Sequence, residues 1–365
     1  MDISCYKIRK ATLCLFPYII GIACFFFYFV NPYFQNGSEN AQFRIDADSF
    51  IYIDLNRAYE NVFLLLAINP NTFGPLFLLR ITQENFVVIF CINLFLFIQS
   101  YKVIVDNYNV KARLFVALII INPLFIPALT TLNKEIFGIG AMAYYLGFLR
   151  NNNTKYFFIS ILLGLITRWQ MVFILIFFHM FKLLIEKFKV GRGKAVFYFI
   201  LLLSLTFPLL LADFTNVGDL NTLERQQDTA GGAISFFNRL QQNYLYIVAA
   251  IPKIFFNLFG NIFRVFGMIV RPSQADFNDI YNNVFMLGYQ LVMFFITLFF
   301  LFFKKISLRD DLTLLCCIYL IVFSLGPMIQ YRYIFPLYIV IITLLSARKP
   351  KSIENDERSA LELKF

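Results

Sequence analysis

The sequence predicts an all-α protein that crosses a membrane about ten times, and three observations lead to this prediction. Hydrophobic residues make up 59% of the 365-residue chain and charged residues only 15%, whereas a soluble domain has about 25% charged residues. The apolar residues gather in long stretches separated by short polar segments. The Lys and Arg residues fall mainly in alternate polar segments, as the positive-inside rule expects.

Ten apolar stretches are candidate spans, because about 20 apolar residues cross the roughly 30 Å of hydrocarbon in a bilayer. They cover residues 11–34, 85–104, 114–131, 135–150, 155–167, 169–185, 195–213, 284–303, 312–329 and 333–348. The first follows Lys7, Arg9 and Lys10 and is longer than the apolar core of a cleaved signal, so we expect an uncleaved signal anchor. The fifth is short, so we expect a broken helix buried among its neighbours.

The distribution of charge orients the chain. One set of alternate loops, together with both termini, holds 21 of the 32 basic residues and 9 of the 22 acids, a net charge of +12. The remaining segments hold 11 bases and 13 acids, a net charge of −2. Because basic loops stay in the cytoplasm, both termini are expected there. The overall charge of +10 then reflects topology, and it calls for no nucleic-acid partner.

We expect a single integral membrane domain over residues 1–348 and a charged, disordered cytoplasmic tail over 349–365. Two long segments, 35–84 and 214–283, fall outside, while the cytoplasmic loops are short, so the functional surface is expected on the outer side. Apolar residues at helical spacing predict helices that lie in the membrane interface within 49–66 and 247–270, with basic side chains reaching water. A pair of short spans is the alternative for 247–270.

The first outer loop carries the acidic candidates Asp46 and Asp48, followed by Tyr52. If a helix starts near Asp48, then Asp48 and Tyr52 share a face at i,i+4 spacing, and Tyr52 is a candidate substrate-binding residue. A carboxylate just above the membrane can take a proton from an acceptor hydroxyl. The alternative role is a helix-capping carboxylate on a surface helix.

Lys134 and Glu135 open a predicted helix on the outer side, after Pro123 and Pro127, which are expected to bend the preceding helix. Backbone N–H groups and the helix dipole favour an anion at such a start, so Lys134 is a candidate phosphate ligand. Glu135 is the reserve candidate for a catalytic carboxylate, better suited to orientation than to proton uptake. The alternative is a charge pair that marks the interface.

Three outer arginines are candidate ligands for an anion, because a guanidinium group pairs bidentately with phosphate oxygens. Arg168 lies at the junction of two spans, where a charge costs about 2.5–3.5 kcal/mol on insertion scales and therefore needs a partner. Arg225 lies in the second long loop and Arg332 between the last two spans. We expect the three to converge on one anionic site, although a solvated loop is the alternative for Arg225.

The sequence contains no candidate metal-binding or cofactor-binding motif. The chain has six cysteines and one histidine, without a CxxC motif or a Cys/His cluster, so no zinc or other metal site is expected. It also has no glycine-rich nucleotide loop, and no cofactor is expected.

Four short motifs together resemble those of multispanning polysaccharide polymerases, namely the Wzy-type O-antigen polymerases and their EpsG-like relatives. They are Asp46-x-Asp48-x3-Tyr52, the proline-rich span ending in Asn133-Lys134-Glu135, the Arg168 junction, and Tyr331-Arg332-Tyr333-x2-Pro336. The first and last motifs are also similar to those of GT-C glycosyltransferases, which use polyprenyl-phosphate sugars. The resemblance covers most of the chain as a layout, but none of the outer arginines is followed by glycine eleven residues later, as in some polymerases.

The resemblance implies a GT-C-like enzyme of the bacterial inner membrane that builds O-antigen or capsule polysaccharide, as in lipopolysaccharide biosynthesis. A glycan on undecaprenyl diphosphate would move to the non-reducing end of another lipid-linked repeat unit. Arginines would stabilise the leaving phosphate, and an Asp or Glu would act as base. Membrane lipid, a chain-length regulator and a flippase are the other candidate partners.

Two other classes of function stay open. A GT-C transferase that adds one sugar has nearly the same expected sequence features. A transporter or flippase for lipid-linked sugars should show internal repeats and polar residues near the bilayer midplane, whereas the polar clusters here fall on one face. A purely structural subunit would explain the topology but not these clusters.

Overall fold

The computed structural model describes residues 15–30, 48–58, 70–214, 232–259, 261–270, 281–303, 306–326 and 331–347. Within these ranges every named element is a helix, and the only β feature there is an isolated bridge between Val110 and Ala347. The all-α prediction is therefore confirmed for the described part of the chain. Asp46, Arg225 and the predicted tail over 349–365 lie outside the described residues.

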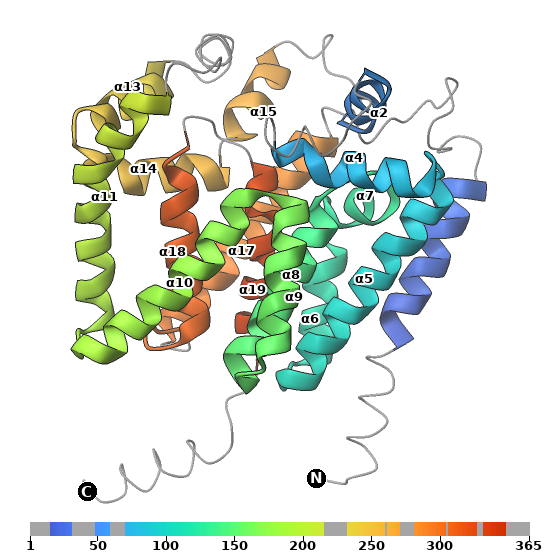
Figure 1. Ribbon diagram of the computed structural model, residues 1–365, viewed down its shortest axis with the longest axis horizontal. Helices are drawn as coiled ribbons and strands as arrows, with labels where there is room; N and C mark the ends of the chain where they lie inside the picture. The colour runs from blue at the N-terminus through green and yellow to red at the C-terminus, as the bar shows by residue number, and fades with distance from the viewer. Residues whose placement is uncertain are drawn as a thin grey trace, which may run out of the picture.

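The main helices run between the upper and lower ends of the molecule (Figure 1). In chain order they are the helix Leu15–Val30, which ends in the π-helix η1 (Phe26–Val30), α5 (Phe86–Asn107), α6 (Ala112–Ile120), α8 (Glu135–Asn151), α9 (Thr154–Thr167), α10 (Trp169–Phe188), α11 (Arg192–Phe214), α17 (Met286–Phe302), α18 (Asp311–Ser324) and α19 (Phe335–Ser346). The π-helix η4 (Tyr281–Phe285) leads into α17. Within the described residues, each predicted span overlaps at least one helix, although spans and helices differ in length.

Shorter helices gather toward the upper end, and Figure 1 shows α4 and α14 lying across the direction of the bundle. The set comprises α2 (Asp48–Ala58), α4 (Pro70–Thr82), α7 (Phe125–Thr130), α13 (Gly232–Gln242), α14 (Tyr246–Phe259), α15 (Asn261–Val270) and the 3-10 helix η5 (Tyr331–Ile334). Most of them belong to the two long segments, 35–84 and 214–283, that were predicted to lie outside.

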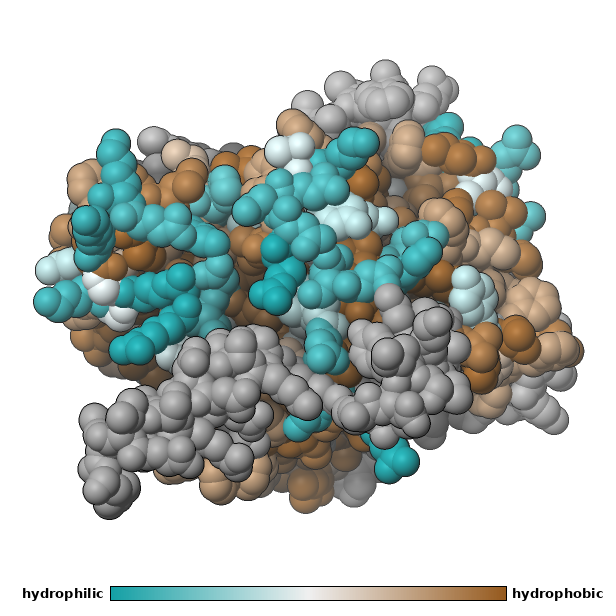
Figure 2. Space-filling view, turned by 90° about the horizontal axis from the view of Figure 1, so that it is seen from below, coloured by the Kyte–Doolittle hydropathy of each residue, from teal (hydrophilic) through white to brown (hydrophobic). Residues whose placement is uncertain are grey.

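Two of the described helices, Phe86–Asn107 and Asn283–Phe302, are long and apolar enough to cross a membrane. Shorter apolar helices accompany them. Large apolar side chains are also exposed along other helices, such as Phe173, Ile176 and Met180 of α10. Seen from below, hydrophilic side chains gather over the lower face, with hydrophobic ones along its edges (Figure 2). An extended apolar exterior of this kind needs an apolar environment.

The predicted span over 114–131 is two helices, α6 and α7, and not one. The break falls at Pro123, which has no N–H to continue a helix, and the side chain of buried Asn122 accepts the Leu124 N–H at 3.0 Å. The nine residues of α6 extend about 14 Å, less than half of a hydrocarbon core. Together, α6 and α7 lead the chain from the lower end, where α5 ends, to the upper end, where α8 begins (Figure 1).

Helix α8 is the centre of the core and packs against α5, α9 and α19. It is buried on nearly every side, which explains why its sequence is apolar all round. A Cβ atom on Gly138 would lie 2.6 Å from Pro336 Cγ, and one on Gly147 would lie 2.7 Å from Tyr156 Cδ2. These glycines let neighbouring helices approach closely, as small residues do in membrane bundles.

Polar contacts join the helix ends at the lower side. Asp311 at the start of α18 bonds Lys182 of α10 at 2.5 Å and Arg192 of α11 at 2.7 Å. The Lys111 N–H donates to Ser346 O at 2.7 Å, which ties α6 to the end of α19. These contacts bring together segments that the charge pattern assigns to one side.

The helix predicted within 49–66 is α2, which begins at Asp48 and is described as far as Ala58. It is held against α4 by side chains: Arg80 Nε donates to Asn56 Oδ1 at 2.7 Å, and Asn56 Nδ2 donates to Glu84 Oε1 at 2.9 Å. Helix α4 was not predicted, because Pro70 and Pro75 usually interrupt helices. Pro70 is tolerated as the first helical residue, where its missing N–H is not needed.

The predicted helical region over 247–270 consists of α14 and α15, but Lys253 does not reach water as expected. It is 4% exposed, and its Nζ donates to Asn238 Oδ1 at 3.0 Å and to Gln241 Oε1. Burial lowers the pKa of Lys253 from 10.5 to about 7. The expected snorkelling is wrong for this residue, because two amide side chains of α13 accept its hydrogen bonds.

The contact between α4 and α9 gives a direct test of the packing. A Cβ on Gly74 would lie 1.9 Å from Ile166 O, a backbone atom that cannot move alone. We expect Gly74→Ala to lower the free energy of unfolding by about 1–3 kcal/mol, as overpacking does. Gly288→Ala is the matched control, since its Cβ would meet nothing within 4 Å. Equal unfolding midpoints for the two variants in detergent would contradict this packing.

Candidate functional site

The site begins with the turn that joins α7 to α8. Asn93, fully buried in α5, donates from Nδ2 to Leu129 O at 3.2 Å and to Thr131 O at 3.0 Å. These bonds satisfy carbonyls at the end of a short helix that has no further turn to satisfy them. The turn thus held delivers Lys134 and Glu135 to the upper end of the bundle.

Glu135 is the first residue of α8 and forms a buried ion pair with Arg168. Glu135 Oε1 lies 3.3 Å from Arg168 Nη2, and the two side chains are 5% and 11% exposed. The start of α8 adds a second favourable field for the carboxylate, because the dipole is positive there. Arg168 therefore has the partner that its depth required, 33 residues earlier in the chain.

Arg168 lies between α9 and α10, and its backbone is extended, with φ −166° and ψ 137°. Its N–H still donates to Gly164 O at 2.8 Å, so the two helices meet without a loop. The guanidinium carbon lies 3.8 Å from the centre of the Tyr333 ring in η5, a cation–π contact. Tyr319 of α18 donates its hydroxyl to Tyr333 O at 2.5 Å and so fixes η5 from the other side.

Lys134 connects this cluster to the crosswise helix above it. It is 7% exposed, and its Nζ donates to Asn71 O, in the first turn of α4, at 2.8 Å. Gly74 of the same helix lies against Ile166, two residues before Arg168. Helix α4 thus covers both the start of α8 and the junction of α9 with α10.

Three buried oxygen atoms on these segments have no hydrogen-bond donor within the described part of the chain. They are Glu135 Oε2, Asn71 Oδ1 and Gln170 Oε1. Buried acceptors normally find donors, because leaving one unsatisfied costs about 1–3 kcal/mol. The cluster therefore offers hydrogen-bond acceptors beside two cations, a combination suited to a ligand that carries both hydroxyl groups and negative charge.

The structure brings together Lys134, Glu135 and Arg168 from the predicted site residues. The backbone of Arg332 belongs to η5, next to Tyr333, while its side chain lies outside the described residues. The side chain of Asp48 also lies outside them, although Asp48 opens α2 as expected. Convergence of Arg225 and Arg332 on Arg168, and the roles of Asp46 and Asp48, stay predictions.

Tyr52, predicted to bind substrate, is 7% exposed and belongs to the hydrophobic core. Two residues of the cluster were not singled out from the sequence. Asn93 could have been noticed as a single amide within an apolar span, because a polar residue in such a span usually has a partner or a function. Tyr319 gave no signal, because a tyrosine in an apolar helix is ordinary membrane composition.

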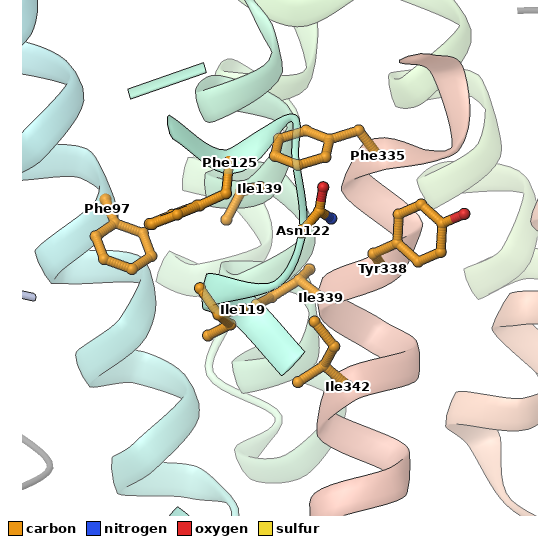
Figure 3. Close-up of a pocket in the computed structure, with 9 residues that line it drawn as sticks. All are labelled: Phe97, Ile119, Asn122, Phe125, Ile139, Phe335, Tyr338, Ile339 and Ile342. Carbon is orange, nitrogen blue, oxygen red and sulfur yellow. The ribbon is translucent and has the colours of Figure 1, made fainter. Parts of the chain in front are cut away.

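A small cavity lies deeper in the bundle, between α5, α6, α8 and α19 (Figure 3). Its volume is about 20 Å³, room for about one water molecule. Asn122 and Tyr338 are the polar residues among its mostly aliphatic and aromatic lining. The cavity is too small for a substrate and is separate from the Arg168 cluster.

In the ranges that the structure describes, no group of three or more His, Cys, Asp or Glu side chains could hold a metal ion. Comparison of the chain with protein-family models, with curated proteins and with solved structures finds no match. The functional argument therefore depends on the residues of this chain.

The buried ion pair is testable by a double-mutant cycle. Arg168→Met leaves Glu135 buried without a counter-charge and should lower the free energy of unfolding by about 3–5 kcal/mol. Adding Glu135→Gln should restore part of this loss, with a coupling of about 1–3 kcal/mol between the two sites in detergent unfolding.

The pair Arg57–Glu84 is a matched control, since it has a similar separation of 3.4 Å but side chains 68% and 32% exposed. Its coupling should stay below about 1 kcal/mol, as for exposed ion pairs. Equal coupling energies for the two pairs, or strict additivity at Arg168 and Glu135, would show that burial gives the inner pair no special weight.

Proposed function

We propose that this chain is a polytopic glycosyltransferase of the bacterial cytoplasmic membrane that polymerises lipid-linked oligosaccharide repeat units on the outer face. Its substrates would be undecaprenyl-diphosphate-linked glycans, and its product O-antigen or capsule polysaccharide. The observation that carries the proposal is the buried Glu135–Arg168 pair beside Lys134, because these charges lie together at one end of an otherwise apolar bundle.

The composition of the cluster supports a substrate that is both anionic and rich in hydroxyl groups. Lys134 and Arg168 supply positive charge, and the unsatisfied oxygens of Glu135, Asn71 and Gln170 can accept hydrogen bonds from sugar hydroxyls. Helices α4 and α14 lie across the bundle at this end (Figure 1), as helices in a membrane interface would. A lipid-linked sugar would present its head group at this depth.

In the proposed reaction, the bond between the first sugar carbon of the growing glycan and the diphosphate oxygen breaks. A new bond forms between that carbon and a hydroxyl oxygen of the acceptor repeat unit. The hydroxyl proton passes to Asp46 or Asp48, and undecaprenyl diphosphate leaves with the bonding electrons. Lys134 and the outer arginines would stabilise charge on the leaving phosphate. Glu135, already paired with Arg168, would orient hydroxyls.

We further propose ten membrane crossings with both termini in the cytoplasm. The count of ten comes from the apolar stretches of the sequence, and the two helices long and apolar enough to cross a membrane support a membrane location. The net charges of +12 and −2 support the orientation. The α6–α7 segment would then cross as two short helices, with the break between them buried in protein, which is how broken helices are tolerated at membrane depth.

A GT-C transferase that adds a single sugar is the second candidate, because the same cluster would suit a polyprenyl-phosphate sugar. A transporter of lipid-linked sugars has less support, since the charged cluster lies toward one end. The class of product separates these functions: a lost polymerase leaves one repeat unit on the lipid, a lost transferase leaves a truncated glycan, and a lost flippase leaves none outside.

Deletion of the gene should therefore leave surface lipopolysaccharide or capsule precursor with one repeat unit, read from product length on gels. Asp48→Asn should insert at normal levels and give the same single-repeat product, because it loses the basic oxygen but keeps its size. Asp54→Asn, on the exposed face of the same helix, is the control and should polymerise normally. If Asp46→Asn and Asp48→Asn both polymerise like the wild type, the first outer loop has no catalytic carboxylate.

Topology can be tested by labelling single cysteines in intact cells, in a variant without the native cysteines. Arg225→Cys should react with a membrane-impermeant reagent, and Val190→Cys should react only after the membrane is opened. Labelling at position 190 but not at 225 in intact cells would reverse the proposed orientation.

A further inference from the structure

A second charged feature lies at the lower end of the bundle, away from the Arg168 cluster. An open hollow of about 630 Å³ lies between the α10–α11 turn and the segment before α18. Its lining includes Gly191, Arg192, Gly193, Lys194, Leu308 and Arg309. A Cβ atom at Gly191 or Gly193 would meet nothing within 4 Å, so the backbone itself is open to a ligand there.

The region around the hollow has a net positive charge, and one of its basic side chains, Arg192, is fixed by contacts. Residues 182–194 and 306–311 carry six basic and three acidic side chains. Arg192 is fixed by Asp311 at 2.7 Å and by the carbonyls of Leu308 and Arg309. Asp311 also bonds Lys182, so one carboxylate serves two cations. Lys194 and Arg309 are exposed and form no ion pair with the residues described.

Large apolar side chains are exposed close in sequence to the residues that line the hollow, and Leu308 is itself one of the lining residues. Phe188, at the end of α10, is 66% exposed, and Leu308 is 38% exposed. Phe303, near the end of α17, is 61% exposed. Exposed apolar side chains would not help to bind a soluble anion. A phospholipid, in contrast, binds through a basic site for its phosphate and an apolar surface for its acyl chains.

We propose that this hollow binds the head group of an anionic phospholipid from the leaflet on the basic side. Lys194 and Arg309 contact the phosphate, Arg192 shapes the site, and the acyl chains lie along Phe188 and Leu308. The bound lipid would join the turn between α10 and α11 to the segment that precedes α18. This inference requires that the bundle lie in a membrane, but it does not depend on the polysaccharide chemistry.

The test uses the purified full-length chain in neutral detergent, with phosphatidylglycerol as the probe and phosphatidylcholine as the comparison. Native mass spectrometry gives the fraction of protein that carries each lipid. The wild type should retain phosphatidylglycerol preferentially, and added salt should weaken this retention. Lys194→Gln combined with Arg309→Gln should reduce the affinity about thirtyfold, or about fivefold for each charge removed.

Arg150→Gln combined with Lys155→Gln is the matched control, because these exposed residues carry the same charge near the turn between α8 and α9. This variant should keep its affinity within about twofold. Equal losses in the two double variants would overturn the proposal, because net charge alone would then explain binding. Equal retention of the two lipids, or displacement of phosphatidylglycerol by millimolar inorganic phosphate, would also overturn it.

Discussion

The ion pair between Arg168 and Glu135 fixes three parts of the chain that lie far apart in sequence. Removing two charges from water costs several kcal/mol for each ion, and the pairing recovers this cost only with good geometry and further contacts. Here the further contacts are the Tyr333 ring over the guanidinium group and the N-terminus of α8 behind the carboxylate. The start of α8, the break between α9 and α10, and η5 are therefore positioned together.

Other features of the fold act to keep this arrangement in place. Asn93 holds the turn before Lys134, and Gly138 lets Pro336 approach α8 closely, which sets the position of η5. Tyr319 then holds the backbone of Tyr333. The result is a polar cluster at the upper end of an apolar bundle, and α4 covers this cluster. At the basic lower end, Asp311 joins α18 to α10 and α11. In the proposed enzyme these two ends meet different sides of the membrane and different lipids.

Helix positions were largely predictable from the sequence, because a run of apolar residues bounded by Lys, Asn or Pro has few other stable structures in a membrane. Pro123 was expected only to bend the span over 114–131, whereas its missing N–H ends one helix and another begins after it. Arg168 was recognised as needing a partner, yet Glu135 could not be chosen, because pairing across 33 residues depends on how α8 and α9 pack. Helix α4 was missed since its prolines suggest a loop, and Lys253 was misjudged because its acceptors come from another helix, α13.

The central claim is that lipid-linked glycan binds at the Arg168 cluster, and a structure of the chain with an undecaprenyl-diphosphate-linked repeat unit tests it most directly. The account predicts the diphosphate at the upper end, with an oxygen within about 3.2 Å of Lys134 Nζ or an outer arginine, and sugar hydroxyls near Glu135 and Gln170. A diphosphate bound at the basic lower end, or a glycan that leaves Lys134, Glu135 and Arg168 untouched, would contradict it.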